Sequence, residues 1–124
     1  MRMPAKDPRP GDFVPLTPAV LHILLAVADG EQHGYAIAQA VEALTDGTVR
    51  MGPGTLYGSI GRMVTSGLLE ESVRARSRAG DDERRRFYRL TTLGRRVLEA
   101  ETDRLARVVA LARAKNVLRR PEPA

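Results

Sequence analysis

Residues 52–63 read Gly-Pro-Gly-Thr-Leu-Tyr-Gly-Ser-Ile-Gly-Arg-Met, and this stretch predicts a helix that begins at Pro53. Proline suits the first helical position because its missing N–H would have no partner there. With about 100° between successive residues, apolar side chains fall on one side of the helix and small or hydroxylated ones on the other. The apolar side is Leu56, Ile60, Met63 and Val64, and the opposite side is Thr55, Ser59, Arg62 and Ser66.

The small, polar side of this helix favours a role in DNA recognition. Small side chains let a helix lie deep in the major groove, and hydroxyls and Arg donate to phosphates and base edges. An ordinary amphipathic surface helix is the alternative for this stretch taken alone. The predicted DNA-facing residues, with Tyr57 and Gly58 at the flank, are Thr55, Tyr57, Gly58, Ser59 and Arg62.

A basic hairpin is predicted directly after this helix. Leu68 and Leu69 lead into an Arg-rich arm, a polar turn containing Gly80, and a return arm that ends at Leu90. Tyr88 and Leu90 share one face by alternation, so we expect them to pack against the helices while the arginines stay in water. The predicted DNA contacts of this hairpin are Arg78, Arg84 and Arg85.

The positive charge is concentrated in the second half of the chain. Residues 13–61 carry a net charge of −3, whereas residues 62–124 hold sixteen basic and nine acidic residues, a net of +7. Residues 74–89 alone hold seven Arg and three acids, a net of +4. Such a one-sided field favours a polyanion as partner. A solvated arginine loop and an anionic membrane surface are the alternatives.

Two further helices are predicted before Pro53. Thr17 is a good N-cap and Pro18 a good first residue for a helix over residues 18–27, which is apolar nearly all round and therefore expected to be buried. A second helix over residues 34–44 places Ile37, Val41 and Leu44 on one stripe. Residues 48–51 are expected to form a short strand. The Pro-rich, charged residues 1–14 are expected to be a disordered tail, and residues 119–124 a frayed one.

A single long helix is predicted over residues 92–118, with Thr91 as its N-cap. Its apolar stripe has no later element to cover it, so we expect a second copy of the chain to cover it instead. Folding of the helix back onto its own domain is the alternative. The predicted dimer-interface residues are Val97, Leu98, Leu105, Val108 and Ala112, with Val109 on the same stripe.

Together these elements predict a mainly α fold with a small β hairpin. Three helices and then a basic hairpin give a winged helix-turn-helix over residues 15–91, followed by a dimerisation helix over 92–118. The chain has no cysteine, two histidines, and no acid at a metal-ligand or triad spacing, so we expect no enzyme, no metal and no cofactor. No signal peptide and no apolar stretch of membrane-spanning length are found, and the expected location is cytoplasmic.

Three motifs in this order resemble the PadR-type bacterial transcriptional regulators. They are His33-Gly34-Tyr35, then Pro53-Gly54-Thr55-Leu56-Tyr57, then Arg85-Arg86-Phe87-Tyr88-Arg89-Leu90-Thr91 leading through Gly94 into the last helix. The resemblance runs from about Leu16 to Leu111. Phe87 departs from the Tyr that the family usually has there. With one helix after the hairpin, the chain is similar to the family's short subgroup.

The resemblance implies a winged-helix homodimer that represses transcription and is released by a small molecule or a stress signal. We expect it to bind a palindromic double-stranded operator, with a non-specific architectural or protein-interaction winged helix as the alternative. Some family members stack an aromatic ligand on Trp between the dimer helices, but this chain has no Trp and no aromatic residue after Tyr88. The expected effector cleft, if a ligand binds at all, is lined by Leu21, Leu24, Leu98 and Leu105.

Overall fold

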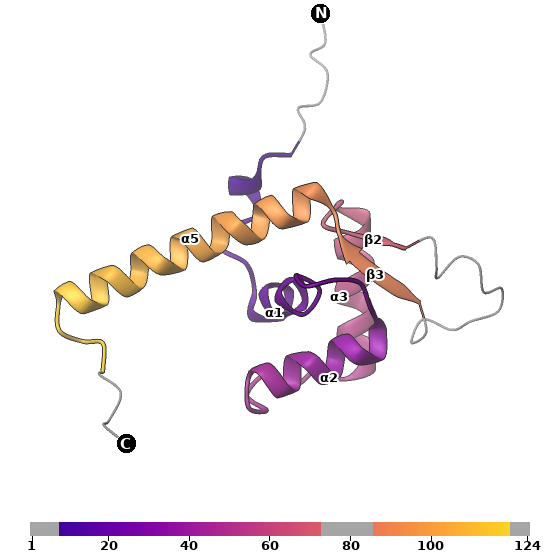
Figure 1. The fold of residues 1–124 in the computed structure, drawn as a ribbon, viewed down its shortest axis with the longest axis horizontal. Coiled ribbons are helices and arrows are strands. Elements are labelled where there is room, and N and C mark those ends of the chain that lie inside the picture. Colours follow the sequence, from indigo (N-terminus) through magenta and orange to yellow (C-terminus); the bar gives the residue numbers. More distant parts are fainter. Residues whose placement is uncertain (1–7, 73–85, 120–124) are drawn as a thin grey trace, which may run out of the picture.

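The computed structural model describes residues 8–72 and 86–119, in which three helices, a small sheet and one long helix share a core (Figure 1). The three helices are α1 (Pro18–Ala26), α2 (Gly34–Leu44) and α3 (Pro53–Thr65). The long helix is α5 (Thr92–Ala114), whose C-terminal half projects beyond the other elements in Figure 1. No helix in these two ranges is long and apolar enough to cross a membrane.

The helices begin where the local sequence predicts. The Thr17 hydroxyl accepts from the Val20 N–H at 3.2 Å to cap α1, and the His33 ring Nδ1 accepts from the Ala36 N–H at 3.1 Å to cap α2. Pro53 is the first residue of α3. Each cap satisfies a backbone donor that the first helical turn leaves unpaired.

The sheet has three antiparallel strands in the order β1 (Gln32–His33), β3 (Phe87–Leu90) and β2 (Leu69–Glu71). The pairing of β2 with β3 confirms the predicted hairpin, and Tyr88 is buried with Leu90 packed on the core as expected. The strand predicted over residues 48–51 is wrong. The Thr45 hydroxyl accepts from the Val49 N–H at 3.1 Å and holds this segment in a turn, while Gln32–His33 takes the free edge of β3.

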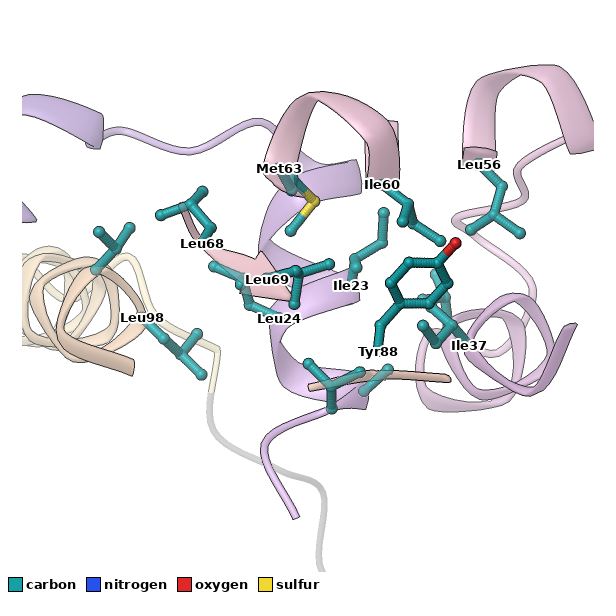
Figure 2. Close-up of a cluster of buried hydrophobic side chains, with 14 residues drawn as sticks. Ile23, Leu24, Ile37, Leu56, Ile60, Met63, Leu68, Leu69, Tyr88 and Leu98 are labelled. Carbon is teal, nitrogen blue, oxygen red and sulfur yellow. The ribbon is translucent and has the colours of Figure 1, made fainter. Parts of the chain in front are cut away.

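The core lies where α1, α2, α3, the sheet and the start of α5 meet (Figure 2). Ile23 and Leu24 of α1 are fully enclosed, so α1 is the central helix of the fold. Burying one such side chain contributes roughly 1.5–3 kcal/mol. Leu44 differs from the prediction because it is 63% exposed: as the last residue of α2, it lies beyond the packed part of the stripe.

The N-terminal segment is more ordered than the sequence predicts. Within the expected tail 1–14, Pro10–Phe13 forms a 3-10 helix, η1, that packs against α5. Phe13 and Leu16 are partly buried on the core, and the Leu16 N–H donates to the Glu101 carboxylate at 2.8 Å. These contacts hold the segment in place, which the Pro-rich composition does not reveal.

The start of α5 is fixed to the end of α3. The Thr91 side chain accepts from the Gly94 N–H at 2.9 Å and donates to the Gly67 carbonyl. Gly94 faces the backbone of Leu68 so closely that a Cβ atom there would lie 2.0 Å from the Leu68 oxygen. The direction of α5 therefore follows from the position of α3.

The apolar stripe of α5 is buried in the first half of the helix and largely exposed in the second half. Val97 and Leu98 are buried in the chain's own core, so their prediction as dimer-interface residues is wrong. The cause is that the first half of α5 packs on α1 and β3, which is the fold-back alternative. Beyond Glu101 the helix is largely exposed, including Val108, Val109 and Leu111, while Leu105 and Ala112 are half-buried.

Candidate nucleic-acid interface

One row along the exposed side of α3 is made of small residues. Gly54, Gly58, Gly61 and Thr65 follow one another at helical spacings of four, three and four, opposite the buried Met63. A shallow depression runs along this side of the helix. It is lined by Tyr57, Gly58, Gly61, Arg62, Thr65 and Ser66.

The orientation of α3 about its axis differs from the prediction. Ser59, predicted to face outward, is buried at 3% exposure, and Val64, predicted to face the core, is 36% exposed. The buried side is therefore Leu56, Ser59, Ile60 and Met63. A serine is small enough to pack between larger apolar side chains, whereas the pattern of bulky residues alone placed the buried side too far toward Val64.

Packing among the described residues does not require the glycines on the exposed side of α3. A Cβ atom at Gly54 or Gly61 would find no atom of the described residues within 4 Å, and one at Gly58 would meet only the Arg62 guanidinium, at 3.5 Å. Each interior helical glycine costs roughly 0.5–1 kcal/mol relative to alanine. What these glycines provide is a smooth helix surface that another molecule can approach closely.

Two side chains on this surface can donate hydrogen bonds outward. Thr55 is exposed in the first turn, beside backbone N–H groups that have no partner within the helix. Arg62 is exposed, and one of its guanidinium nitrogens, Nη2, donates to Ser59 Oγ at 3.2 Å. Tyr57 and Gly58, which were also predicted to face DNA, are half-buried. The arrangement suits a partner rich in acceptors.

The hairpin arginines predicted to contact DNA, Arg78, Arg84 and Arg85, lie outside the described residues. Two other arginines of the basic segment are described, and both are exposed. Arg86 pairs with Glu71 at 3.3 Å and Arg89 with Glu70 at 2.8 Å. The acids of β2 therefore offset the charges of Arg86 and Arg89, and the other arginines of the basic segment lie outside the described residues.

Comparison with known proteins identifies the family. Residues 20–100 match the model of the transcriptional regulator PadR-like family. The chain belongs to the PadR-like family. Members of this family are transcriptional regulators and not enzymes.

Two relatives share this part of the chain at the sequence level. Transcriptional regulator Rv3488 from Mycobacterium tuberculosis is 38% identical over 92 residues, which cover 72% of this chain and 79% of the relative. An uncharacterized 37.1 kDa protein in transposon TN4556 of Streptomyces fradiae is 40% identical over 90 residues. These cover 73% of this chain but 24% of that protein, so the chain spans about a quarter of its length.

Solved structures share the fold. A PadR family transcription regulator from hypervirulent Clostridium difficile superposes with a TM-score of 0.63 at 20% identity, covering 79% of this chain and 97% of the other. Bacillus subtilis PadR in complex with operator DNA superposes with a TM-score of 0.53 at 17% identity, covering 84% of this chain and 49% of the other. The winged helix-turn-helix prediction is thereby confirmed.

In this PadR-like chain, His33 of the first motif and Phe87 of the third contact each other. His33 caps α2, and its ring meets the edge of Phe87 with the ring centres 5.7 Å apart. This contact with β3 requires only an aromatic ring at residue 87. Phe87 provides the ring, so the contact does not need the hydroxyl of Tyr. The contact holds the start of α2 against the hairpin.

Of the four leucines predicted to line an effector cleft, two are enclosed in the chain's own core. Leu24 and Leu98 are enclosed in the core, and Leu21 and Leu105 are half-buried. The first half of α5 packs directly on α1, and Leu24 and Leu98 belong to the core that the two helices share. Within residues 8–72 and 86–119, no three His or acidic side chains are grouped to hold a metal ion.

Glu101 is the residue that the sequence analysis missed. Its side chain is 1% exposed, accepts from the Leu16 N–H at 2.8 Å, and accepts from Arg104 Nε at 2.6 Å. The sequence did contain a signal. Glu101 lies between Val97 and Leu105 at helical spacing, so it falls on the apolar stripe, with an Arg three residues later to pair with it.

Proposed function

We propose that this PadR-like regulator is a sequence-specific repressor that places α3 in the major groove of double-stranded DNA. The observation that carries the proposal is the exposed glycine side of α3, which packing among residues 8–72 and 86–119 does not explain. In the major groove, a helix without side chains on its outer row can bring its backbone close to the base edges. Thr55 and Arg62 flank that row and supply the donors.

The hairpin supplies the backbone contacts in this proposal. The seven arginines of residues 74–89 support it, and Arg78, Arg84 and Arg85 are the proposed phosphate or minor-groove contacts. Contacts to phosphate fix the position of a protein on the duplex, whereas contacts to base edges specify the sequence. The proposal therefore assigns affinity mainly to the hairpin and specificity mainly to α3.

A homodimer completes the proposed DNA-binding form. The exposed apolar residues on the outer half of α5, including Val108, support pairing with a second copy through that half. A two-fold dimer would present two α3 helices to half-sites about 34 Å apart, one helical turn of DNA, on a palindromic operator. We propose that repression ends when a small molecule or a stress signal changes this spacing.

Non-specific architectural binding is the second candidate, and the same positive field would support it. The two functions differ in the ratio of affinities for specific and random DNA. Sequence-specific proteins bind their sites typically 10³-fold or more tightly than other sequences. A ratio near one between the promoter upstream of the protein's own gene and random DNA would establish the architectural function instead.

The first prediction concerns Arg62. Arg62→Ala is expected to weaken operator binding by roughly 1–3 kcal/mol if Arg62 contacts a base, and to do so with little change on random DNA. Fluorescence anisotropy with labelled promoter and random duplexes at fixed salt measures both. Arg113→Ala removes the same charge at the exposed end of α5 and serves as the control. Wild-type operator affinity in the Arg62→Ala protein would show that Arg62 does not touch DNA.

A further inference from the structure

Ser59 is a polar residue on the buried side of the proposed recognition helix. Its neighbours along that side are Leu56, Ile60 and Met63, all at 2% exposure. Its hydroxyl oxygen accepts a hydrogen bond from Arg62 Nη2 at 3.2 Å. A residue enclosed with the core therefore holds a side chain that lies on the exposed surface.

Folding alone does not favour a serine at this position. Alanine forms helices better than serine, and it buries no polar group. An alanine would also fit a site that already accepts the larger serine. The Ser59 hydroxyl is therefore expected to lower the stability of the fold, unless its hydrogen bond with Arg62 serves a function.

The geometry shows what that contact does to Arg62. Long side chains on a helix point back toward its N-terminus, and the Arg62 guanidinium lies over Gly58, one turn earlier, 3.5 Å from where a Cβ atom would be. A larger side chain at residue 58 would compete for this space. Ser59 and Gly58 thus hold the guanidinium over the preceding turn of the helix, at the depression that Arg62 lines together with Gly61 and Thr65.

The Arg62 guanidinium has further N–H donors besides the one that binds Ser59. It carries five N–H donors in a planar fork, and Ser59 engages one nitrogen. The remaining edge can donate two parallel hydrogen bonds, and the O6 and N7 acceptors of guanine in the major groove match that geometry. Ordering a flexible Arg on binding costs entropy, and a side chain ordered beforehand loses less.

We propose that Ser59 is a positioning residue, which orders Arg62 in the free protein so that its outer edge reads a guanine in the operator. The inference rests on the proposed function, because it assigns a base contact to the same site. It predicts that removing the Ser59 hydroxyl weakens recognition at the base pair that Arg62 reads and at no other.

A double-mutant cycle tests this. Ser59→Ala is expected to weaken operator binding by roughly 3- to 10-fold, the value of one hydrogen bond, while leaving the midpoint of thermal unfolding unchanged or raised. Single base-pair substitutions in the operator should show that Ser59→Ala and Arg62→Ala lose discrimination at the same position. Ser59→Ala should add nothing in the Arg62→Ala background. Thr102→Ala removes a hydroxyl on α5, away from α3, and should leave discrimination intact.

A measurement without DNA separates this inference from the proposed function. Nitrogen-15 relaxation of the Arg62 Nε–H in the free protein should show greater mobility in Ser59→Ala than in the wild type. Equal mobility, or additive losses in the cycle, would overturn the positioning role even if the wild type binds its operator specifically. A wild type that binds promoter and random DNA equally would overturn the proposed function, and the guanine contact with it.

Discussion

Glycine has two opposite uses in the helices of this protein. At Gly94 the missing side chain lets α5 lie against the backbone of Leu68, where a Cβ atom would be 2.0 Å from the carbonyl oxygen. At Gly61 the missing side chain leaves an open surface, with no atom of residues 8–72 or 86–119 within 4 Å of the Cβ position. Gly94 is required for the packing of α5, whereas Gly61 leaves a surface that a binding partner can approach.

The two alanine substitutions are therefore expected to have opposite effects on stability. Gly94→Ala should lower the free energy of unfolding by about 2 kcal/mol or more, because the backbone of Leu68 must move. Gly61→Ala should raise it by roughly 0.5–1 kcal/mol through better helix propensity. Urea denaturation followed by circular dichroism measures both.

DNA binding provides the second half of this test. If α3 lies deep in the groove, Gly61→Ala should bind the operator more weakly than the wild type although the protein is more stable. Operator affinity equal to or above that of the wild type would mean that the glycine side of α3 does not approach DNA.

For single residues of α3, the sequence predicts which bulky side chains are buried better than it predicts the side on which each smaller residue lies. Leu56, Ile60 and Met63 were predicted to be buried and are, but Ser59 and Val64 were assigned to each other's side. Helical periodicity locates the apolar side from bulky residues, and it cannot tell which small polar residue the core will enclose. That choice depends on the neighbouring helices, which are distant in the sequence.

Among the elements, α5 depends on one buried carboxylate. Glu101 lies between the half of α5 that packs on the core and the half that is exposed. The hydrogen bond from Arg104 and then that from the Leu16 N–H hold the pKa of Glu101 below its ordinary value of 4.5, although burial acts in the opposite direction. The contact ties the segment before α1 to the middle of α5.

The lowered pKa predicts how stability depends on pH. Because the folded pKa lies below the unfolded one, this contribution to stability is fully present above about pH 4.5 and is lost as the pH falls through the folded pKa. Glu101→Gln should be less stable than the wild type at pH 7, and the difference should shrink in acid. Unfolding curves of both proteins between pH 7 and pH 3 test this. A constant difference across that range would show that the carboxylate charge is not the source.

The elements themselves were largely predictable where local chemistry defines them. Thr17, Pro53 and Thr91 mark helix starts because their capping or first-turn roles involve residues at most four positions away. The strand Gln32–His33 was not predicted, because two residues carry no pattern and their pairing with β3 spans more than fifty residues. The division of the α5 stripe was missed for the same reason.

At the scale of the whole molecule, the outer half of α5 remains the candidate for pairing with a second copy. Val108 is 48% exposed, and Val109 and Leu111 are exposed beside it. Among the described residues no other element covers them. A second copy that packed on this surface would bury apolar area and set the distance between two α3 helices.

A charge at Val108 tests this arrangement. Val108→Asp should shift the protein toward the monomer in analytical ultracentrifugation and weaken operator binding, because a dimer would bury an unpaired carboxylate. The monomer should fold normally, since the position is half exposed. Ala110→Asp, on the opposite side of the helix, adds the same charge and should do neither. A fully dimeric Val108→Asp protein with intact operator affinity would locate the dimer contact elsewhere.

The junction at Thr91 also limits how such a protein can be recombined. Only this one residue separates the last hairpin strand from α5, and the helix then delivers Val97 and Leu98 to the same core as α1. A chimera that joined the winged-helix part of this chain to another protein's pairing helix at residue 91 would remove part of its own interior. A chimera that keeps this interior would have to retain the segment from Pro10 and α5 through Arg104. The foreign helix would then be joined after Arg104.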